Sequence, residues 1–494
     1  MRKAIVAAFA VGAAVTAAAT AGAPSHASSP ASSPAVAPLV TVRPDVLKAG
    51  KAISQDPPAL AYCGRFYGID CYQPAQLRAA YHLPGVYATG LTGHGTTIAI
   101  VDPYGSPTLA RDLAVFDRRF RLPAPPSLRV IAPAGRIPAY NPDSPMASWA
   151  EETTLDTEYA HAIAPGANIL VVETPVSETE GVAGFPQIVA AEEYVIRHHM
   201  AGVISQSFDA TEETFAGYPQ LAPLRAAYEL AYRDHVTVLT SSGDSGAAGL
   251  RLDGSTYYTR PVASWPDSDP LVTAVGGTRL LPGPGGTYSS VVWNDTYDTK
   301  VTGPPPSPSA SGGGTSAYFR RPAYQDGVAS VTGAARGIPD ISMNAACSAV
   351  VETYSSYAGG PGGWSLNCGT SEAVPELAGI VALAGQEAGH PVGLINPLLY
   401  MLSAVHAPGI VDVTKGDNTV SFEQGGKLVT VRGFAARPGY DLTSGVGTID
   451  ARYFVGELAE GAFLSQAPGP RTASLPRSAP PPPSSPLPRT NHDL

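Results

Sequence analysis

Short apolar segments of strand length alternate with longer segments of helical pattern through much of this chain of 494 residues. Strand patterns cover residues 96–101 and 167–172, and helical patterns cover residues 73–81 and 107–120. Such an alternation is typical of a parallel β-sheet whose strands are connected by covering helices. The sequence therefore predicts an α/β fold, with three layers and a mostly parallel central sheet flanked by helices.

The same patterns continue further along the chain. Additional strands are expected at residues 202–205, 236–240 and 271–275, and additional helices at residues 186–197 and 219–234. Residues 303–314 are rich in Pro and Gly and are expected to form a loop.

The first residues have the pattern of an export signal. Met1-Arg2-Lys3 is followed by an apolar stretch and then by Ser25-His26-Ala27, which matches a charged start, a hydrophobic segment and a small-residue cleavage site. An uncleaved membrane anchor is the alternative, but the apolar stretch is at the short end for a bilayer span. We therefore expect residues 1–27 to be a signal peptide and the protein to be secreted and extracellular.

Composition divides the rest of the chain into three parts. Residues 28–60 are expected to be a Ser/Pro/Ala-rich linker or a short pro-segment, and residues 61–460 a single large domain. Residues 461–494 include the run Pro480 to Pro483 and are expected to form a disordered Pro-rich tail.

Charge excludes some partners. The formal net charge of −10 argues against binding to nucleic acid, and the sequence has no basic cluster that would bind anionic lipid. We expect no nucleic-acid partner, no membrane contact after signal cleavage, and a monomer.

The four cysteines fall into two local pairs, Cys63 with Cys71 and Cys347 with Cys368. In an exported protein an even number of cysteines favours disulfides, and these two are the natural pairing among the three that four cysteines allow. Metal binding is the weaker interpretation, because the sequence has no Cys-x-x-Cys and no closely spaced Cys/His set.

Glu152 and Asp156 are four residues apart in a segment of helical pattern. On a helix both carboxylates project from one face, so their titrations are coupled. One of them can then stay ionised and accept a proton from a hydroxyl while the other orients it. Taken alone, this spacing more often belongs to a solvated helix face.

Ser371 follows Gly369 and Thr370 and precedes an apolar helical pattern that contains Pro375. A serine at a helix start exposes its hydroxyl, and its backbone N–H lies at the positive end of the helix dipole. An N-cap serine without a catalytic role is the commoner case.

Asp244 lies in a glycine-rich turn, Ser241 to Gly246, after an expected strand. An aspartate in such a turn usually stabilises the turn itself. If it faces Ser371, however, its protonated carboxyl can donate a hydrogen bond to an oxyanion, which predicts activity in acid.

Together these segments resemble the sedolisins, the serine-carboxyl peptidases with a subtilisin-like fold. The resemblance extends from about Tyr72 to Val455, and its motifs, in the order of the family, are Trp149 to Asp156, Ser205-Gln206-Ser207, Ser241 to Gly246, Val275 to Thr278, Pro339 to Ser342 and Gly369-Thr370-Ser371 with Pro375. It implies a peptidase domain over residues 61–460. It also implies Ser371 as nucleophile, Glu152 as general base, Asp156 as its partner and Asp244 as the oxyanion-hole acid.

The resemblance further implies a Ca²⁺ site near the C-terminus. Its ligands would be the carboxylates of Asp412 and Asp441 and the backbone carbonyls of Val413, Arg437 and Gly439, oxygen donors of the kind that calcium prefers. Arg437 departs from the small residue that is usual in the family, although only its carbonyl is needed. An ordinary Asp/Gly loop is the alternative.

The chain also departs from the family before the catalytic segments, since only residues 28–60 stand where the family has a large prodomain. A subtilisin-type Ser-His-Asp triad is a further alternative, because Asp102 ends an expected strand. Its histidine is missing: His94 precedes that strand, His161 lies more than two turns beyond Glu152, and Glu152 stands in the place of the histidine. Asp102 is instead a candidate for a supporting partner of the carboxyl pair.

The sequence thus predicts a secreted serine-carboxyl peptidase that is active in acid, either an endopeptidase or a tripeptidyl-peptidase. The alternative from another functional class is a protein that has the peptidase fold but no catalytic activity, and that binds peptide or glycan at the cell surface through the former substrate cleft.

Overall fold

The structure, a computed structural model, describes residues 46–47, 57–358 and 362–466. The expected signal peptide, most of the linker and most of the Pro-rich tail lie outside these residues. Among the helices of the described residues, none combines the length and the apolar character that a membrane span requires.

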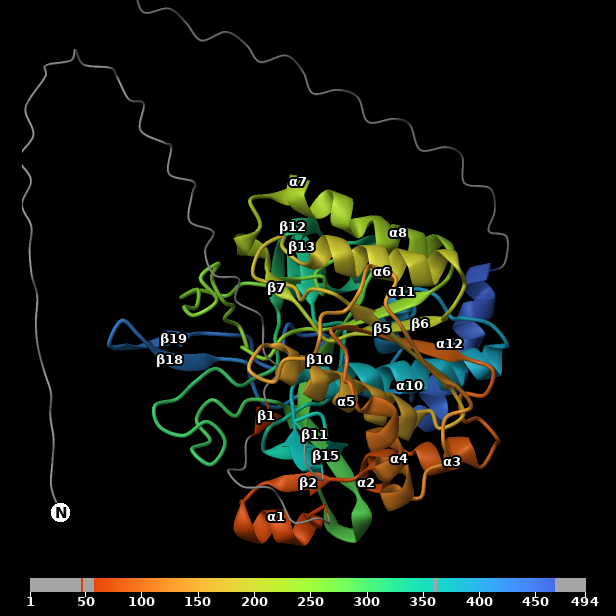
Figure 1. Cartoon of the computed structure of the whole chain (residues 1–494). Coiled ribbons are helices and arrows are strands. Elements are labelled where there is room, and N and C mark those ends of the chain that lie inside the picture. The colour runs from red at the N-terminus through yellow and green to blue at the C-terminus, as the bar shows by residue number, and fades with distance from the viewer. Residues whose placement is uncertain (1–45, 48–56, 359–361, 467–494) are drawn as a thin grey trace, which may run out of the picture. The chain divides into compact units, whose positions relative to one another are not determined.

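An eight-stranded sheet forms the centre of the fold (Figure 1). In spatial order its strands are β11 (Tyr288–Val292), β10 (Thr273–Pro282), β8 (Thr237–Ser241), β6 (Val203–Gln206), β3 (Thr97–Pro103), β5 (Asn168–Thr174) and β4 (Leu128–Ile131), and β14 (Ile341–Asn344) pairs with β10. All neighbouring strands are parallel except β10 and β11. The mostly parallel sheet predicted from the alternating pattern is therefore confirmed.

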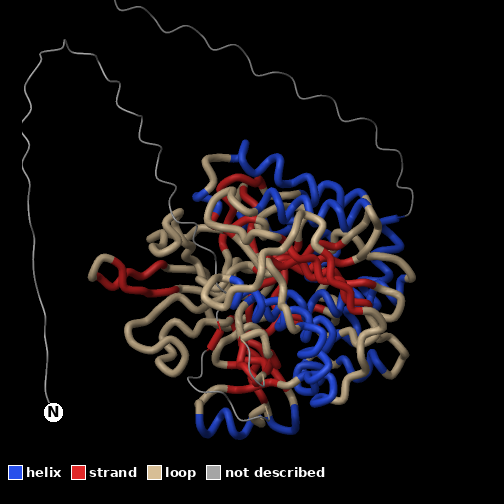
Figure 2. Tube along the Cα trace, viewed as in Figure 1, coloured by secondary structure: helices blue, strands red, loops and turns tan. Residues whose placement is uncertain are grey.

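Helices cover both faces of this sheet (Figure 2). One face packs against α5 (Met146–Ile163) and α10 (Thr370–Ala388), with α12 (Ala451–Gln466) beyond them, and the other packs against α6 (Phe185–Arg197) and α8 (Ala226–Arg233). A separate apolar core lies on each side, because strands of a parallel sheet are buried on both faces. The sheet and the helices on its two faces thus form the three predicted layers.

The described residues form seven further helices and four 3₁₀ turns. They are α1 (Leu60–Phe66), α2 (Pro74–Ala80), α3 (Leu83–Tyr87), α4 (Leu109–Phe120), α7 (Tyr218–Leu221), α9 (Ala329–Thr332) and α11 (Asn396–Ala404), with 3₁₀ turns η1 (Glu212–Thr214), η2 (Ala222–Arg225), η3 (Pro284–Gly286) and η4 (Ala323–Val328).

Smaller sheets surround the central one. A four-stranded sheet contains β1 (Val46–Leu47), β16 (Gly363–Asn367), β15 (Ala349–Ser355) and β2 (Asp70–Tyr72). Four two-stranded sheets pair β12 (Gly314–Arg320) with β13 (Ala335–Ile338), β17 (Ile410–Val411) with β20 (Thr448–Ile449), β18 (Val420–Gln424) with β19 (Lys427–Val431), and β7 (Ala210–Thr211) with β9 (Ser264–Trp265).

Two expectations differ from the structure. The single helix predicted over residues 219–234 is wrong, because α7, η2 and α8 divide that segment. Pro223 explains the break, since proline has no N–H to donate and its ring disturbs the preceding helical turn. At the C-terminus α12 continues to Gln466, beyond the boundary expected at residue 460.

Both predicted disulfides are present. Cys63 bonds to Cys71, and Cys347 bonds to Cys368. The sulfurs of the first pair lie near the buried Glu352, but a disulfide sulfur is no longer a thiolate and is therefore a poor metal ligand.

Candidate active site

Three polar residues lie where neighbouring parallel strands end. Asp102 is near the end of β3, Ser207 directly follows β6, and Asp244 lies in the turn after β8. These strands are adjacent in the sheet, so their carboxyl ends bring the three side chains to one edge. In open α/β sheets this is the edge at which ligands bind.

Helix α5 adds the two predicted carboxyls. Glu152 and Asp156 are one turn apart on it, and their side chains are 1% and 0% exposed. The same electrostatic neighbourhood includes Asp102, which is also fully buried and which raises the pKa of both. The structure thus brings Asp102, Glu152 and Asp156 together as one buried acidic group.

Burial controls the ionisation of this group. It raises the pKa of Glu152 well above the usual range, and the charge of Asp102 raises it further. The nearby hydroxyls of Ser371 and Ser207 act in the opposite direction, because they favour the charged form. Burial likewise raises the pKa of Asp102 to about 7. Carboxyls coupled in this way share their protons instead of all ionising together.

Ser207 was not assigned a role from the sequence, where it is only part of the Ser205-Gln206-Ser207 motif. In the structure its hydroxyl lowers the pKa of both Glu152 and Asp156. Its position directly after a buried parallel strand is the sequence signal that points to a site residue.

Ser371 is in the first turn of α10, as predicted. The residue before this helix, Gly369, has φ 111°, a value that side chains rarely adopt, and a Cβ there would lie 2.6 Å from Oδ2 of Asp244. Glycine therefore allows the helix to begin against the Asp244 carboxyl. The backbone N–H groups of a first turn have no acceptor within the helix, so that of Ser371 is available to a ligand.

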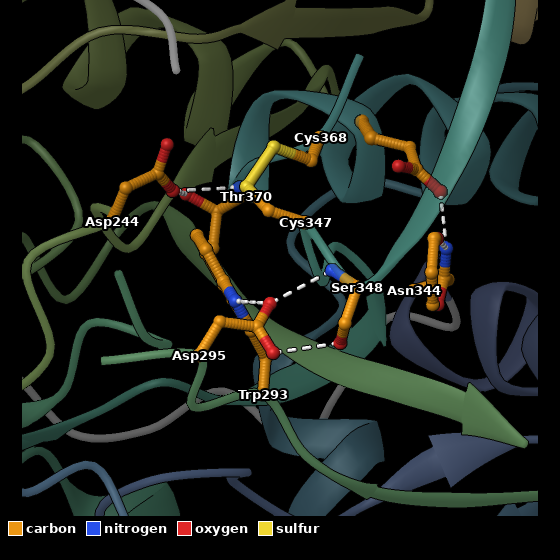
Figure 3. Close-up of a disulfide and its surroundings, with 10 residues drawn as sticks. Asp244, Trp293, Asp295, Asn344, Cys347, Ser348, Cys368 and Thr370 are labelled. Atoms are coloured by element: carbon orange, nitrogen blue, oxygen red, sulfur yellow. Dashed lines mark hydrogen bonds between the residues drawn. A yellow bond between two sulfur atoms is a disulfide. The ribbon is translucent and has the colours of Figure 1, made fainter. Parts of the chain in front are cut away.

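Asp244 is bound to the same helix end (Figure 3). The N–H and the hydroxyl of Thr370 both donate to Oδ1 of Asp244, each at 2.7 Å. Burial nevertheless raises the pKa of Asp244, because the two hydrogen bonds offset only part of the desolvation.

The Cys347–Cys368 disulfide lies directly before α10 and supports the start of this helix (Figure 3). Next to it, the N–H and hydroxyl of Ser348 donate to the buried carboxylate of Asp295, at 2.9 and 2.6 Å. The indole N–H of Trp293 donates to the same carboxylate at 2.9 Å. These bonds fix the loop that carries Cys347.

A cleft with a volume of about 470 Å³ opens beside these groups. Ser371, Thr370 and Asp244 line it, together with Ser207 and Trp149. Glu152 lies behind this lining, within the electrostatic reach of Ser371. The arrangement places a serine hydroxyl, a buried carboxyl and a second carboxyl of raised pKa around one space.

The two histidines weighed for a subtilisin-type triad take no part. His161 is buried, its Nε2 lies 2.8 Å from the carbonyl oxygen of Pro123 and 3.2 Å from Asp117 Oδ1, and it therefore packs α5 against its surroundings. His94 is exposed, and its N–H donates to Gln386.

Hydrogen bonds join the two segments that carry the five predicted calcium ligands. The carboxylate of Asp412 accepts a hydrogen bond from the N–H of Gly439 at 2.8 Å, and that of Asp441 accepts one from the N–H of Arg437 at 2.9 Å. Ser444 connects Asp441 to the carbonyl of Val413. The carboxylates of Asp412 and Asp441 and the carbonyl of Val413 are hard oxygen donors of the kind that Ca²⁺ prefers.

Comparison with known proteins gives several relatives. The chain is 31% identical to kumamolisin of Bacillus sp. (strain MN-32) over 386 residues, which cover 76% of this chain and 62% of kumamolisin. It is 28% identical to tripeptidyl-peptidase 1 of Homo sapiens over 312 residues, or 60% of this chain and 50% of that protein. The chain therefore spans between half and two thirds of the length of these relatives. No protein-family model matches it.

Comparison with solved structures gives a fold match in the same family as these sequence relatives. The fold matches that of Pseudomonas sedolisin, described as a serine-carboxyl proteinase complexed with two molecules of pseudo-iodotyrostatin, with a TM-score of 0.64 and 25% identity. The match covers 79% of this chain and 98% of the sedolisin chain. From its sequence relatives, its fold and the arrangement of its carboxyls around a serine, this chain belongs to the sedolisin family of serine-carboxyl peptidases.

Proposed function

We propose that the protein is a secreted serine-carboxyl peptidase, which hydrolyses peptide bonds in acid through an acyl-enzyme intermediate formed by residues of the domain at 61–460. The observation that carries the proposal is the position of Ser371, which lines one cleft with Asp244 and whose hydroxyl interacts with the buried Glu152. Its substrates would be proteins or peptides.

In the first step the Ser371 oxygen attacks the carbonyl carbon of the peptide bond, and its proton passes to Glu152. Asp156 and Asp102 belong to the same coupled group of carboxyls and share with Glu152 the negative charge that allows it to accept this proton. A base whose pKa is raised by burial is a stronger proton acceptor than an ordinary glutamate.

The carbonyl oxygen becomes negative as the new bond forms. The N–H of Ser371 donates one hydrogen bond to this oxygen, and Asp244 donates a second from Oδ2, because Thr370 already occupies its Oδ1. Glu152 then returns the proton to the departing amine as the peptide bond breaks. A water molecule then attacks the acyl carbon while Glu152 accepts its proton. The bond to the Ser371 oxygen breaks, the proton returns to that oxygen, and the acid product leaves.

The requirement for acid follows from the two different states of these carboxyls. Asp244 must keep its proton in order to donate, whereas the group around Glu152 must hold a negative charge in order to accept. The raised pKa of Asp244 widens the pH range in which both conditions are met.

We also propose that Asp412, Asp441 and the carbonyls of Val413, Arg437 and Gly439 hold Ca²⁺. Bound there, the ion would connect the segment after β17 to the loop between β19 and β20. The ion would take no part in the proposed reaction and would stabilise the folded protein.

The activity is tested with the secreted chain and a mixture of peptides, whose products are identified by mass spectrometry. We expect cleavage in acid that is lost with Ser371→Ala and retained with Ser403→Ala, a matched serine on α11. Equal cleavage by folded Ser371→Ala would contradict the proposal, and absence of cleavage by the folded wild type at every pH would favour the non-catalytic alternative. The position of the cuts in the products distinguishes an endopeptidase from a tripeptidyl-peptidase.

A further inference from the structure

We propose that Asp209, with Glu180 beside it, makes the cleft selective for peptides that carry a lysine or arginine side chain next to the scissile bond. The inference rests on the proposed function and names a substrate class for the same cleft. Both residues line that cleft together with Ser371 and Asp244.

Asp209 lies close to the proposed oxyanion acid. It follows β6 by three residues, at the sheet edge where Asp244 follows β8. A Cβ added to Gly243 would lie 3.0 Å from Oδ2 of Asp209, so this carboxyl rests against the turn that carries Asp244. The two carboxyls are within electrostatic reach of each other.

Glu180 extends the acidic wall. It is 7% exposed, and its Oε2 accepts a hydrogen bond from the N–H of Thr211 at 3.0 Å, which fixes the carboxyl in place. Asp209 raises the pKa of Glu180, so these two carboxyls, which line the same cleft, are within electrostatic reach of each other. Three acids, Glu180, Asp209 and Asp244, therefore line one space.

No lysine, arginine or histidine is among the described residues that line the cleft. Arg260, which is close in the sequence to the lining residues, pairs instead with Glu213 at 2.9 Å. Much of the remaining lining is small, which leaves room for a long side chain: Ala248, Gly249, Gly254, Ser255, Gly312 and Gly313. A cationic side chain that enters the cleft would meet carboxyls and small residues.

An independent observation also indicates a ligand in this cleft. Trp149 lines it and is 1% exposed, yet its indole N–H has no hydrogen-bond partner among the described residues. A buried indole N–H normally donates to an acceptor. The carbonyl oxygen of a bound peptide would supply this acceptor.

The two acids would play different parts toward a bound cation. Burial raises the pKa of Asp209 to about 6 and that of Glu180 to about 9. A cation at short range favours the ionised form of a carboxyl, so Asp209 is the first to ionise and to form the ion pair. Glu180 keeps its proton and offers its carbonyl oxygen as a hydrogen-bond acceptor.

The test compares peptides that differ only at the residue whose carbonyl is attacked, with arginine in one and citrulline, its neutral isostere, in the other. We expect the wild type to prefer arginine in kcat/KM by about tenfold or more, as for a charge-assisted contact. Asp209→Asn should bring this ratio close to one, chiefly by lowering kcat/KM for the arginine peptide. Asp209→Ser serves if Asp209→Asn does not fold.

Glu213→Gln is the matched control, because it removes a carboxylate outside the lining and should leave the ratio unchanged. A wild type without preference for arginine, or a preference that persists in both Asp209 variants, would overturn the inference. Binding of the same peptides to Ser371→Ala, followed by fluorescence anisotropy, separates this inference from the proposed function. Tighter binding of the arginine peptide that depends on Asp209 supports selectivity even without cleavage, and equal binding of both peptides overturns it.

Discussion

Thr370 donates two hydrogen bonds to a single oxygen of Asp244, one from its backbone N–H and one from its hydroxyl, each at 2.7 Å. Thr370 immediately precedes Ser371, so these bonds connect the proposed oxyanion acid to the helix of the proposed nucleophile. They also leave Oδ2, which faces Gly369, as the oxygen that would carry the proton of the proposed acid. This asymmetry predicts how substitutions of Asp244 will behave.

Asp244→Asn should keep more activity than Asp244→Ala. The asparagine carbonyl can accept the bonds from Thr370 while its amide donates to the oxyanion, whereas alanine does neither, and loss of one such donor costs about 10²- to 10³-fold in kcat. Because an amide does not ionise, the alkaline fall in activity due to Asp244 should disappear in Asp244→Asn. Profiles of kcat against pH for both variants check this, and equal loss in both would refute the role.

Asp102→Asn should move the acid side of the activity profile to lower pH. The charge of Asp102 raises the pKa of Glu152, so a neutral side chain in its place lowers that pKa. The measurement is kcat/KM against pH, with Asp298→Asn on the loop after β11 as a control. An acid limb that stays in place, or moves to higher pH, would show that Asp102 does not act on the base.

The folded protein should be most stable in acid. Burial raises the pKa of Glu352 and Glu192 to about 8, whereas an unfolded glutamate has a pKa of about 4.3. A carboxyl with a raised folded pKa favours folding below its unfolded pKa, and this contribution is lost as the pH rises toward its folded pKa. Thermal unfolding should therefore show Tm falling from about pH 4 toward pH 8.

Glu192→Gln separates this effect from others. Glu192 is 0% exposed on α6, away from the cleft, and neither of its carboxyl oxygens has a hydrogen-bond partner among the described residues. The variant should have a smaller fall in Tm between acid and neutral pH. If the curves of Tm against pH for wild type and variant run parallel, Glu192 does not ionise between about pH 4 and pH 8.

Removal of calcium should lower the stability of the protein. Chelation is expected to decrease Tm, and calorimetric titration of the chelated protein with Ca²⁺ alone should give one binding event. Asp412→Asn removes one of the two proposed carboxylates and should weaken binding, whereas Asp298→Asn should not. Unchanged binding by Asp412→Asn would place any calcium elsewhere.

The sequence predicted the central fold because its strands and helices are long and regular in pattern. The prediction failed where one residue altered a regular pattern, as Pro223 does in the segment that forms α7 and α8. The sequence also identified Glu152, Asp156, Asp244 and Ser371 as candidates, and the structure brings all four to one sheet edge.

The parts of the site that the sequence did not predict depend on packing between distant segments. Ser207 and Asp209 follow an expected strand, but their place beside Asp244 and the carboxyl pair comes from the order of β3, β6 and β8 in the sheet. The link between Thr370 and Asp244 likewise joins residues that are 126 positions apart. Contacts between residues so far apart in the sequence can be identified only once the fold is known.

The central claim, that a buried carboxyl and not a histidine activates Ser371, is tested most directly by the pH profile of kcat/KM for wild type, Glu152→Gln and His161→Gln. The account predicts a maximum in acid for the wild type, loss of about 10²-fold or more with Glu152→Gln, and a profile of unchanged shape with His161→Gln. Activity confined to neutral or alkaline pH that survives Glu152→Gln would contradict it.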